Sequence, residues 1–118
     1  MLEVALKLQF TIIELRRYQP EDDSSPATDW LRGLRDMRAR AQIEVRLRRV
    51  STGNFADCKG VGEGVSELRI EIGSGYRVYY GRHGQALVML LCGGDKASQQ
   101  TDITQAKDYW ADWKRKNS

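Results

Sequence analysis

Three segments between residues 64 and 96 decide the fold: Gly64-Val-Ser-Glu-Leu-Arg-Ile, Gly75-Tyr-Arg-Val-Tyr-Tyr and Leu87-Val-Met-Leu-Leu-Cys-Gly-Gly-Asp-Lys. Their β-branched and aromatic residues, with glycine turns between them, predict three consecutive strands at residues 65–72, 76–81 and 86–92. The third segment is so continuously apolar that it is expected to lie inside the sheet. Arg69 and Arg77 fall within the first two strands, and burying an unpaired cation costs several kcal/mol. Both side chains are therefore expected on a sheet face that is open to solvent.

The rest of the chain supplies one more strand and three helices. An alternating, β-rich segment predicts a first strand at residues 8–15. Ser25-Pro26 is an N-cap followed by proline at the first helical position, and Asp36 is a second candidate cap. The second of these helices is expected to end at Gly53-Asn54, and a last helix to run from Ser98 to about residue 116. Residues 54–64, which contain three glycines, are expected to form a loop.

This order, β-α-α-β-β-β-α, predicts an α+β fold with a mainly antiparallel sheet and helices packed on one face. The 118 residues are 41% hydrophobic and 30% charged, which is typical of a single globular domain spanning residues 1–118. No stretch approaches the roughly 18 apolar residues of a membrane span, and the first ten residues lack the pattern of a signal peptide. The chain is therefore expected to be cytoplasmic and free of membrane.

Metal and cofactor chemistry is not expected. The chain has one histidine and two cysteines, Cys58 and Cys92, which do not form the ligand spacing of a zinc or haem site. The net charge is +3, and 13 of the 19 basic residues are arginine. Because guanidinium binds phosphate in a planar, bidentate geometry, this bias favours nucleic acid, with ordinary surface solvation as the alternative.

The predicted helical hairpin is strongly basic on its outer side. Seven arginines lie between residues 31 and 50, against only two acidic residues. Arg46 and Arg49 are therefore candidates for contact with RNA phosphates. The same helix face would equally suit an acidic protein partner or simple exposure to solvent.

The motifs Glu67-Leu-Arg-Ile, Gly75-Tyr-Arg-Val-Tyr-Tyr and Leu90-Leu-Cys-Gly-Gly-Asp-Lys resemble those of the phage-derived addiction-module killer proteins in the RelE/ParE/HigB toxin superfamily. The segment Gly53-Asn54-Phe55-Ala56-Asp57-Cys58-Lys59 is similar too. The resemblance implies a RelE-like fold and a type II toxin that a small helix-turn-helix antitoxin neutralises. It also implies a metal-independent endoribonuclease that cuts mRNA, often on the ribosome. The ParE branch instead inhibits DNA gyrase, and a non-enzymatic phage-derived protein that binds nucleic acid is a further alternative.

Metal-free RNA cleavage needs cations for the charge of the phosphorane, and an acid and a base for the two oxygens. Arg69 and Arg77 suit the charge-stabilising role, and Lys96, just after the apolar strand, is a third catalytic candidate. Lys59, in the preceding loop, is a candidate for RNA binding. Ion pairing of Arg69 with Glu67 or Glu71, and support of the hairpin by Arg77, are the structural alternatives.

The candidates for the acid and base are Asp95, Tyr79, Tyr80 and His83. Asp95 would equally serve to cap the last helix, because it directly follows Gly93-Gly94. Tyr79 and Tyr80 are adjacent, so they must point to opposite faces of a strand. Tyr80 is a candidate platform for stacking RNA bases, and at least one of the tyrosines is expected in the core.

Overall fold

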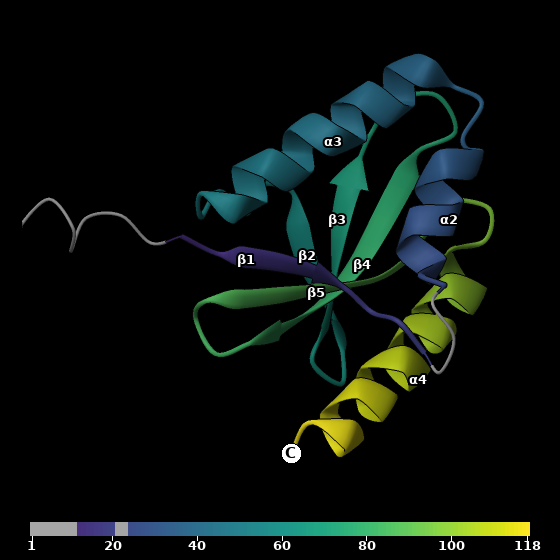
Figure 1. Cartoon of the computed structure of the whole chain (residues 1–118). Helices are drawn as coiled ribbons and strands as arrows, with labels where there is room; N and C mark the ends of the chain where they lie inside the picture. The colour runs from purple at the N-terminus through teal and green to yellow at the C-terminus, as the bar shows by residue number, and fades with distance from the viewer. Residues whose placement is uncertain (1–11, 21–23) are drawn as a thin grey trace, which may run out of the picture.

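The computed structural model describes residues 12–20 and 24–118. Within these ranges the helices and strands follow one another in a single α+β domain (Figure 1). In chain order they are β1 (Glu14–Arg17), α2 (Pro26–Gly33), α3 (Met37–Ser51), β2 (Cys58–Gly62), β3 (Val65–Ile70), β4 (Tyr76–His83), β5 (Leu87–Asp95) and α4 (Gln99–Lys116). None of the helices in the described ranges has the length and apolar composition needed to cross a bilayer.

The five described strands form one mixed sheet in the order β1-β5-β4-β3-β2. β1 runs parallel to β5, and the other three strand pairs are antiparallel. The prediction of a mainly antiparallel sheet is therefore confirmed, as is the position of β5 inside it. The register of β3 on β4 places Arg69 directly opposite Arg77 and Glu67 opposite Tyr79.

Two strands differ from the sequence-based expectation. The segment 54–64 is not only a loop, because it contains β2, which pairs with β3 and places Lys59 opposite Glu67. The sequence did not predict this strand for two reasons. Its glycines have low strand propensity, and a register shift between Gly60 and Gly62 interrupts the alternation of side chains between the two sheet faces. Residues 8–11 of the strand expected at 8–15 lie outside the described part of the chain, and β1 spans Glu14–Arg17, two residues beyond the expected end.

The helix starts agree with the capping signals in the sequence. The Ser25 side chain accepts a hydrogen bond from the Thr28 amide, and Pro26 occupies the first helical position of α2. Asp36 Oδ1 accepts from the amides of Arg38 and Ala39, each at 3.1 Å, and so caps α3. α4 follows Ser98, as predicted.

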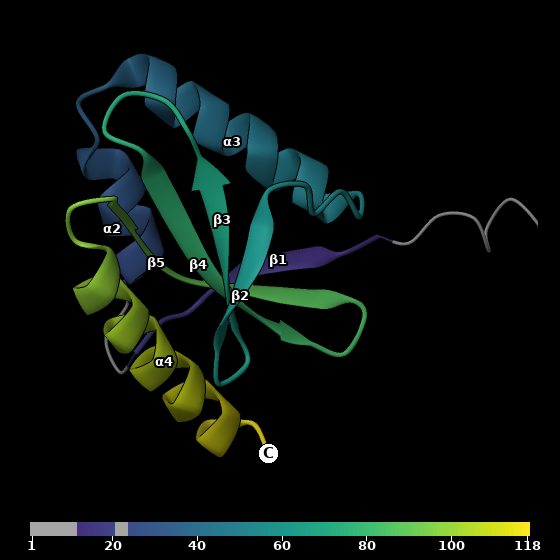
Figure 2. The same ribbon diagram turned by 180° about the vertical axis from the view of Figure 1, so that it is seen from behind.

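The expectation that the helices pack on one face is wrong, because both faces are covered. α2 and α3 pack on the face that carries Tyr80 and Leu90, whereas α4 packs on the face that carries Tyr79 and Leu91. Figures 1 and 2 show the strands lying between α3 above and α4 below. The continuously apolar sequence of β5 reflects this arrangement, since its residues contact a helix on either side.

Gly81→Ala is expected to lower the free energy of unfolding by about 1–3 kcal/mol, because an added methyl group would overlap the buried ring of Trp110 on α4. Gly60→Ala is the matched control in β2, where an added methyl meets no atom within 4 Å. Urea unfolding of both variants measures the difference. An equal loss in both would show that the close approach of α4 to Gly81 does not decide the effect.

Candidate functional site

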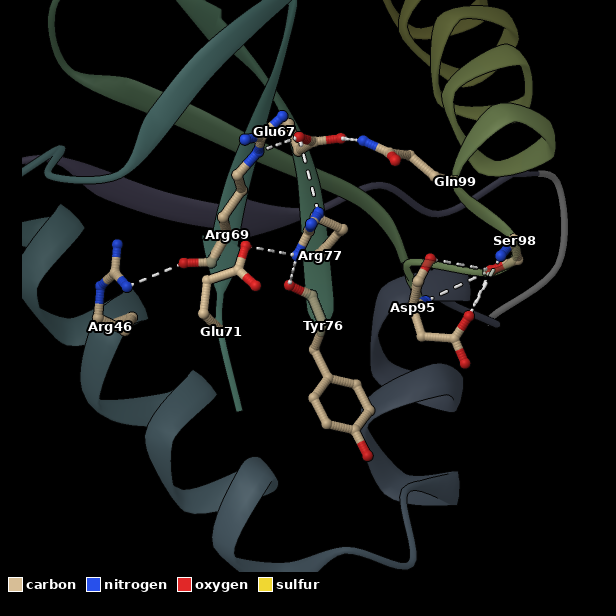
Figure 3. Close-up of polar contacts among 9 residues, drawn as sticks. All are labelled: Arg46, Glu67, Arg69, Glu71, Tyr76, Arg77, Asp95, Ser98 and Gln99. Atoms are coloured by element: carbon tan, nitrogen blue, oxygen red, sulfur yellow. Dashed lines mark hydrogen bonds and ion pairs between the residues drawn. The ribbon is translucent and has the colours of Figure 1, made fainter. Parts of the chain in front are cut away.

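The candidate site lies on the sheet face that packs against α4, where β3 and β4 meet the first turn of that helix. Glu67, Arg69 and Arg77 project from this face, since the side chains of a strand alternate between its two faces. Glu71 directly follows β3 and pairs with Arg77. Figure 3 shows these four side chains converging on one another, with Gln99 reaching them from α4.

Glu67 is the centre of the cluster and is fully buried, with 0% of its side chain exposed. Its Oε1 accepts a hydrogen bond from Arg69 Nε at 2.7 Å, and Oε2 accepts one from Gln99 Nε2 at 2.8 Å. Burial alone would raise the pKa of Glu67, but the contacts with Arg69, Gln99 and Tyr79 and the charge of Arg69 outweigh it, so the pKa lies below its ordinary value. The carboxylate is therefore ionised at neutral pH and anchors the arginines.

The two strand arginines differ in exposure. Arg77 is 3% exposed, so the expectation that it lies on an open face is wrong. Glu67 Oε1 lies 3.8 Å from Arg77 Nε, and Glu71 Oε1 lies 3.2 Å from its Nη1, which also donates to the Tyr76 carbonyl. These partners compensate the buried charge of Arg77. The sequence analysis did not predict its burial, because it considered each strand without the contacts between strands. Arg69 keeps 37% of its side chain exposed and is available to a ligand.

Lys96 joins this cluster through the turn before β4. A Cβ added at Gly75 would lie 3.6 Å from Arg77 Nη1, 3.6 Å from Lys96 Cβ and 3.7 Å from Glu71 Oε2. Gly75 has φ +75°, a left-handed conformation that glycine adopts readily, and its missing side chain lets these groups approach. The structure therefore brings Arg69, Arg77 and Lys96 together, as the sequence predicted, and adds the exposed carboxylate of Glu71.

The predicted acid and base residues have other partners. Asp95 Oδ1 accepts hydrogen bonds from the amides of Ala97 and Ser98, so it holds the turn that leads into α4. Tyr79 is 0% exposed, and its hydroxyl lies beside the buried carboxylate of Glu67. Burial and the nearby charge of Glu67 both raise the pKa of Tyr79. Tyr79 therefore does not present its hydroxyl to solvent, and Asp95 has a structural role in the turn before α4.

The predicted RNA-binding residues are dispersed. Lys59 is exposed on β2, opposite Glu67 and on the same sheet face as Arg69. Arg46 is only 13% exposed, because its guanidinium donates to the carbonyls of Arg69, at 3.0 Å, and Ala56. Arg49 is exposed on α3, and Tyr80 is buried beneath that helix. Lys59 is thus the member of this group whose exposed side chain lies on the same sheet face as that of Arg69.

Three members of the cluster were not predicted as site residues from the sequence: Glu67, Glu71 and Gln99. Glu67 and Glu71 alternate with Arg69 at a spacing of two, which would place all three on one face of the strand predicted at residues 65–72. No pattern in the sequence pointed to Gln99, because it comes from α4 and lies 32 positions from Glu67 in the chain.

His83 lies at the opposite end of β4 from Arg77, where its ring contacts Trp113 at 5.2 Å between centroids. The described residues contain no group of acidic, histidine or cysteine side chains that would hold a metal ion.

Comparison with known proteins places the chain in a family. It is 53% identical over 78 residues to a protein of Haemophilus influenzae that is described as uncharacterized. The match covers 66% of this chain and 79% of the relative. No family model matches the sequence. The chain belongs to the same family as the Haemophilus influenzae protein.

Proposed function

We propose that this chain is the toxin of a type II toxin–antitoxin system and a metal-independent endoribonuclease that cleaves mRNA. The observation that carries this proposal is the partly exposed guanidinium of Arg69, oriented by the buried carboxylate of Glu67 at 2.7 Å. Lys59 on β2 and Lys96 directly after β5 are both exposed, and these two strands flank the β4-β3 pair in the sheet. The α+β architecture and the resemblance to RelE/ParE/HigB toxins support the same assignment.

The charge of the site favours an anionic ligand. The site and its margins carry four cations (Lys59, Arg69, Arg77 and Lys96) and three carboxylates (Glu67, Glu71 and Asp95). Guanidinium groups hold phosphate oxygens in a bidentate geometry, and a fixed guanidinium needs little reorganisation as charge develops. The excess positive charge therefore suits a phosphodiester and the phosphorane that forms from it.

The reaction that these groups support is an internal transesterification of RNA. The exposed Glu71 carboxylate takes the proton of the ribose 2′-OH, and the 2′-oxygen attacks the adjacent phosphorus. Arg69 stabilises the charge of the phosphorane, while Arg77 keeps Glu71 in place through the ion pair at 3.2 Å. The bond from phosphorus to the 5′-oxygen breaks, and the Lys96 ammonium protonates that oxygen. The products are a 2′,3′-cyclic phosphate and a 5′-hydroxyl.

Glu71→Gln is expected to slow cleavage of mRNA by about 10²-fold, because the amide cannot accept the proton of the 2′-OH. The rate is measured from new mRNA 5′ ends in a purified translation reaction. Glu63→Gln is the matched control, since Glu63 is also an exposed carboxylate in an ion pair, with Lys107 at 3.3 Å. Cleavage at the wild-type rate by the Glu71 variant would exclude this residue as the base.

A second candidate function is inhibition of DNA gyrase in the manner of ParE toxins. It is favoured by the engagement of Asp95 in a turn and the burial of Tyr79, which leave two of the residues predicted for proton transfer without that role. The exposed arginines of α3, such as Arg38 and Arg49, would then contact protein. Intact mRNA together with loss of gyrase supercoiling activity would support this function over the ribonuclease.

The proposed partners follow from the toxin assignment. A helix-turn-helix antitoxin would neutralise the chain in the cytoplasm, and the ribosome would present the mRNA. Co-expression of a small helix-turn-helix protein from an adjoining gene should restore growth to cells that express this chain. Its inability to form a complex with the chain would count against the toxin–antitoxin assignment under either mechanism.

A further inference from the structure

A second candidate site lies at the far end of α4, where the last turns of that helix pass the end of β1. It is a pocket of about 230 Å³, here called the Trp113 pocket, and its lining includes Arg16, Tyr18, Gln19, Trp113, Lys116 and Asn117. The 17 residue steps from Gln99 to Lys116 place it roughly 25 Å along the helix from the Glu67 cluster, at about 1.5 Å per residue. The pocket is therefore separate from the site described above.

The aromatic wall of this pocket is held in place by its neighbours. The ring of Trp113 stacks on the buried Trp110 with 5.2 Å between centroids and an interplanar angle of 1°. The Tyr18 ring packs on Tyr109 at 4.9 Å, and its hydroxyl donates to Asp112 at 2.5 Å. Because these contacts fix the rings, a planar ligand would meet a surface that is already ordered.

Cations and amides complete the lining. Arg16 and Lys116 pair with Glu14 at 2.7 Å and with Asp112 at 3.0 Å, but their side chains are 56% and 44% exposed. Exposed ion pairs of this kind contribute little stability, so both cations can turn to a phosphate at small cost. Asn117 Nδ2 donates to the Trp113 carbonyl, which leaves its Oδ1 to accept from a ligand.

We infer that the Trp113 pocket binds one nucleobase of single-stranded RNA, stacked against Trp113, with the flanking phosphates on Arg16 and Lys116. An aromatic wall beside cations is the arrangement by which proteins hold single-stranded nucleic acid, and stacking accepts any base. An acidic peptide would use the cations but not the planar wall. This inference goes beyond the proposed function, because binding here does not require cleavage.

The first test measures binding of a 2′-O-methyl oligouridine pentamer, which lacks the 2′-OH nucleophile and so reports binding alone. Lys116→Gln is expected to weaken binding about five-fold and to reduce the slope of log affinity against log salt by about 0.7, the value for one lost phosphate contact on a single strand. Arg115→Gln is the matched control. Arg115 also pairs with Asp112 but is 74% exposed and does not line the pocket. Equal weakening in both variants, or no binding by the wild type, would overturn the inference.

The second test follows tryptophan fluorescence during the same titration. The pentamer should quench the wild-type protein, and Trp113→Phe should remove most of that quenching while a smaller ring still packs on Trp110. Arg69→Ala should leave the quenching unchanged, whether or not it abolishes cleavage, so failure of this inference and failure of the proposed ribonuclease are distinguishable. Undiminished quenching in Trp113→Phe would place the RNA elsewhere on the protein.

Discussion

Glu67→Ala is expected to lower the free energy of unfolding by about 3–5 kcal/mol, because it leaves the buried charge of Arg77 with too few partners. Glu67 and Arg77 are both almost wholly buried, and the same carboxylate also binds Arg69 and Gln99. Its removal therefore breaks the link between β3, β4 and the start of α4 at once. Urea unfolding followed by circular dichroism measures the loss.

Glu71→Ala is the control for that experiment, since Glu71 is the other carboxylate that pairs with Arg77. The Glu71 side chain is 64% exposed and keeps much of its hydration, and Glu67 stays beside the buried Arg77 when Glu71 is removed, so the loss is expected to be only about 1 kcal/mol. A loss in Glu67→Ala no larger than the loss in Glu71→Ala would contradict the assignment of Glu67 as the anchor of the cluster.

The contribution of Glu67 should also depend on pH. The folded protein holds the pKa of Glu67 below its ordinary value of 4.5, so the ionised carboxylate favours the folded state. This contribution is complete above the pKa of the unfolded chain and is lost as the pH falls through the lower, folded pKa. The difference in stability between the wild type and Glu67→Ala should therefore be constant near neutral pH and shrink in acid. A difference in stability that grows in acid would show that folding raises the pKa of Glu67 instead of lowering it.

Arg69→Ala is expected to reduce cleavage of mRNA by about 10²–10³-fold, because it removes the exposed guanidinium that stabilises the phosphorane. Arg69→Lys keeps the charge but loses the bidentate geometry, so it should fall between the wild type and Arg69→Ala. The rate comes from new mRNA 5′ ends in the purified translation reaction, at a temperature where thermal melts show that each variant is folded.

Arg82→Ala provides the control for Arg69. Arg82 is also an exposed strand arginine, but its guanidinium lies over the Phe55 ring at 4.4 Å, on the sheet face that carries α3. Its removal should leave the cleavage rate within about two-fold of the wild type, because it contacts no group of the proposed site. A similar loss of activity in both variants would point to general surface charge instead of a defined role for Arg69.

Local signals in the sequence predicted the helix starts and three of the strands. Ser25, Pro26 and Asp36 act within three residues of themselves, so their effect does not depend on the rest of the fold. The sequence analysis did not predict that helices cover both faces of the sheet, although the continuous apolar sequence of β5 is typical of a strand buried on both faces. β2 was missed because glycines removed the side chains that would have shown its alternation.

Only part of the candidate site was predicted, because sequence patterns report local structure and not tertiary contacts. Arg69, Arg77 and Lys96 lie within one continuous segment, so their proximity follows from a hairpin and a neighbouring strand. The burial of Arg77 depends on the Glu67 carboxylate and on the packing of α4, which are tertiary contacts. Capping by Asp95 was an open alternative in the sequence, and the structure gives its hydrogen-bond partners.

The most direct measurement of the central claim is a map of mRNA ends after addition of the purified chain to a purified translation reaction. The account predicts new ends that carry a 5′-hydroxyl and a 2′,3′-cyclic phosphate, formed by the wild type and lost in Arg69→Ala while Arg82→Ala retains them. Intact mRNA in the presence of folded wild-type protein would contradict the account.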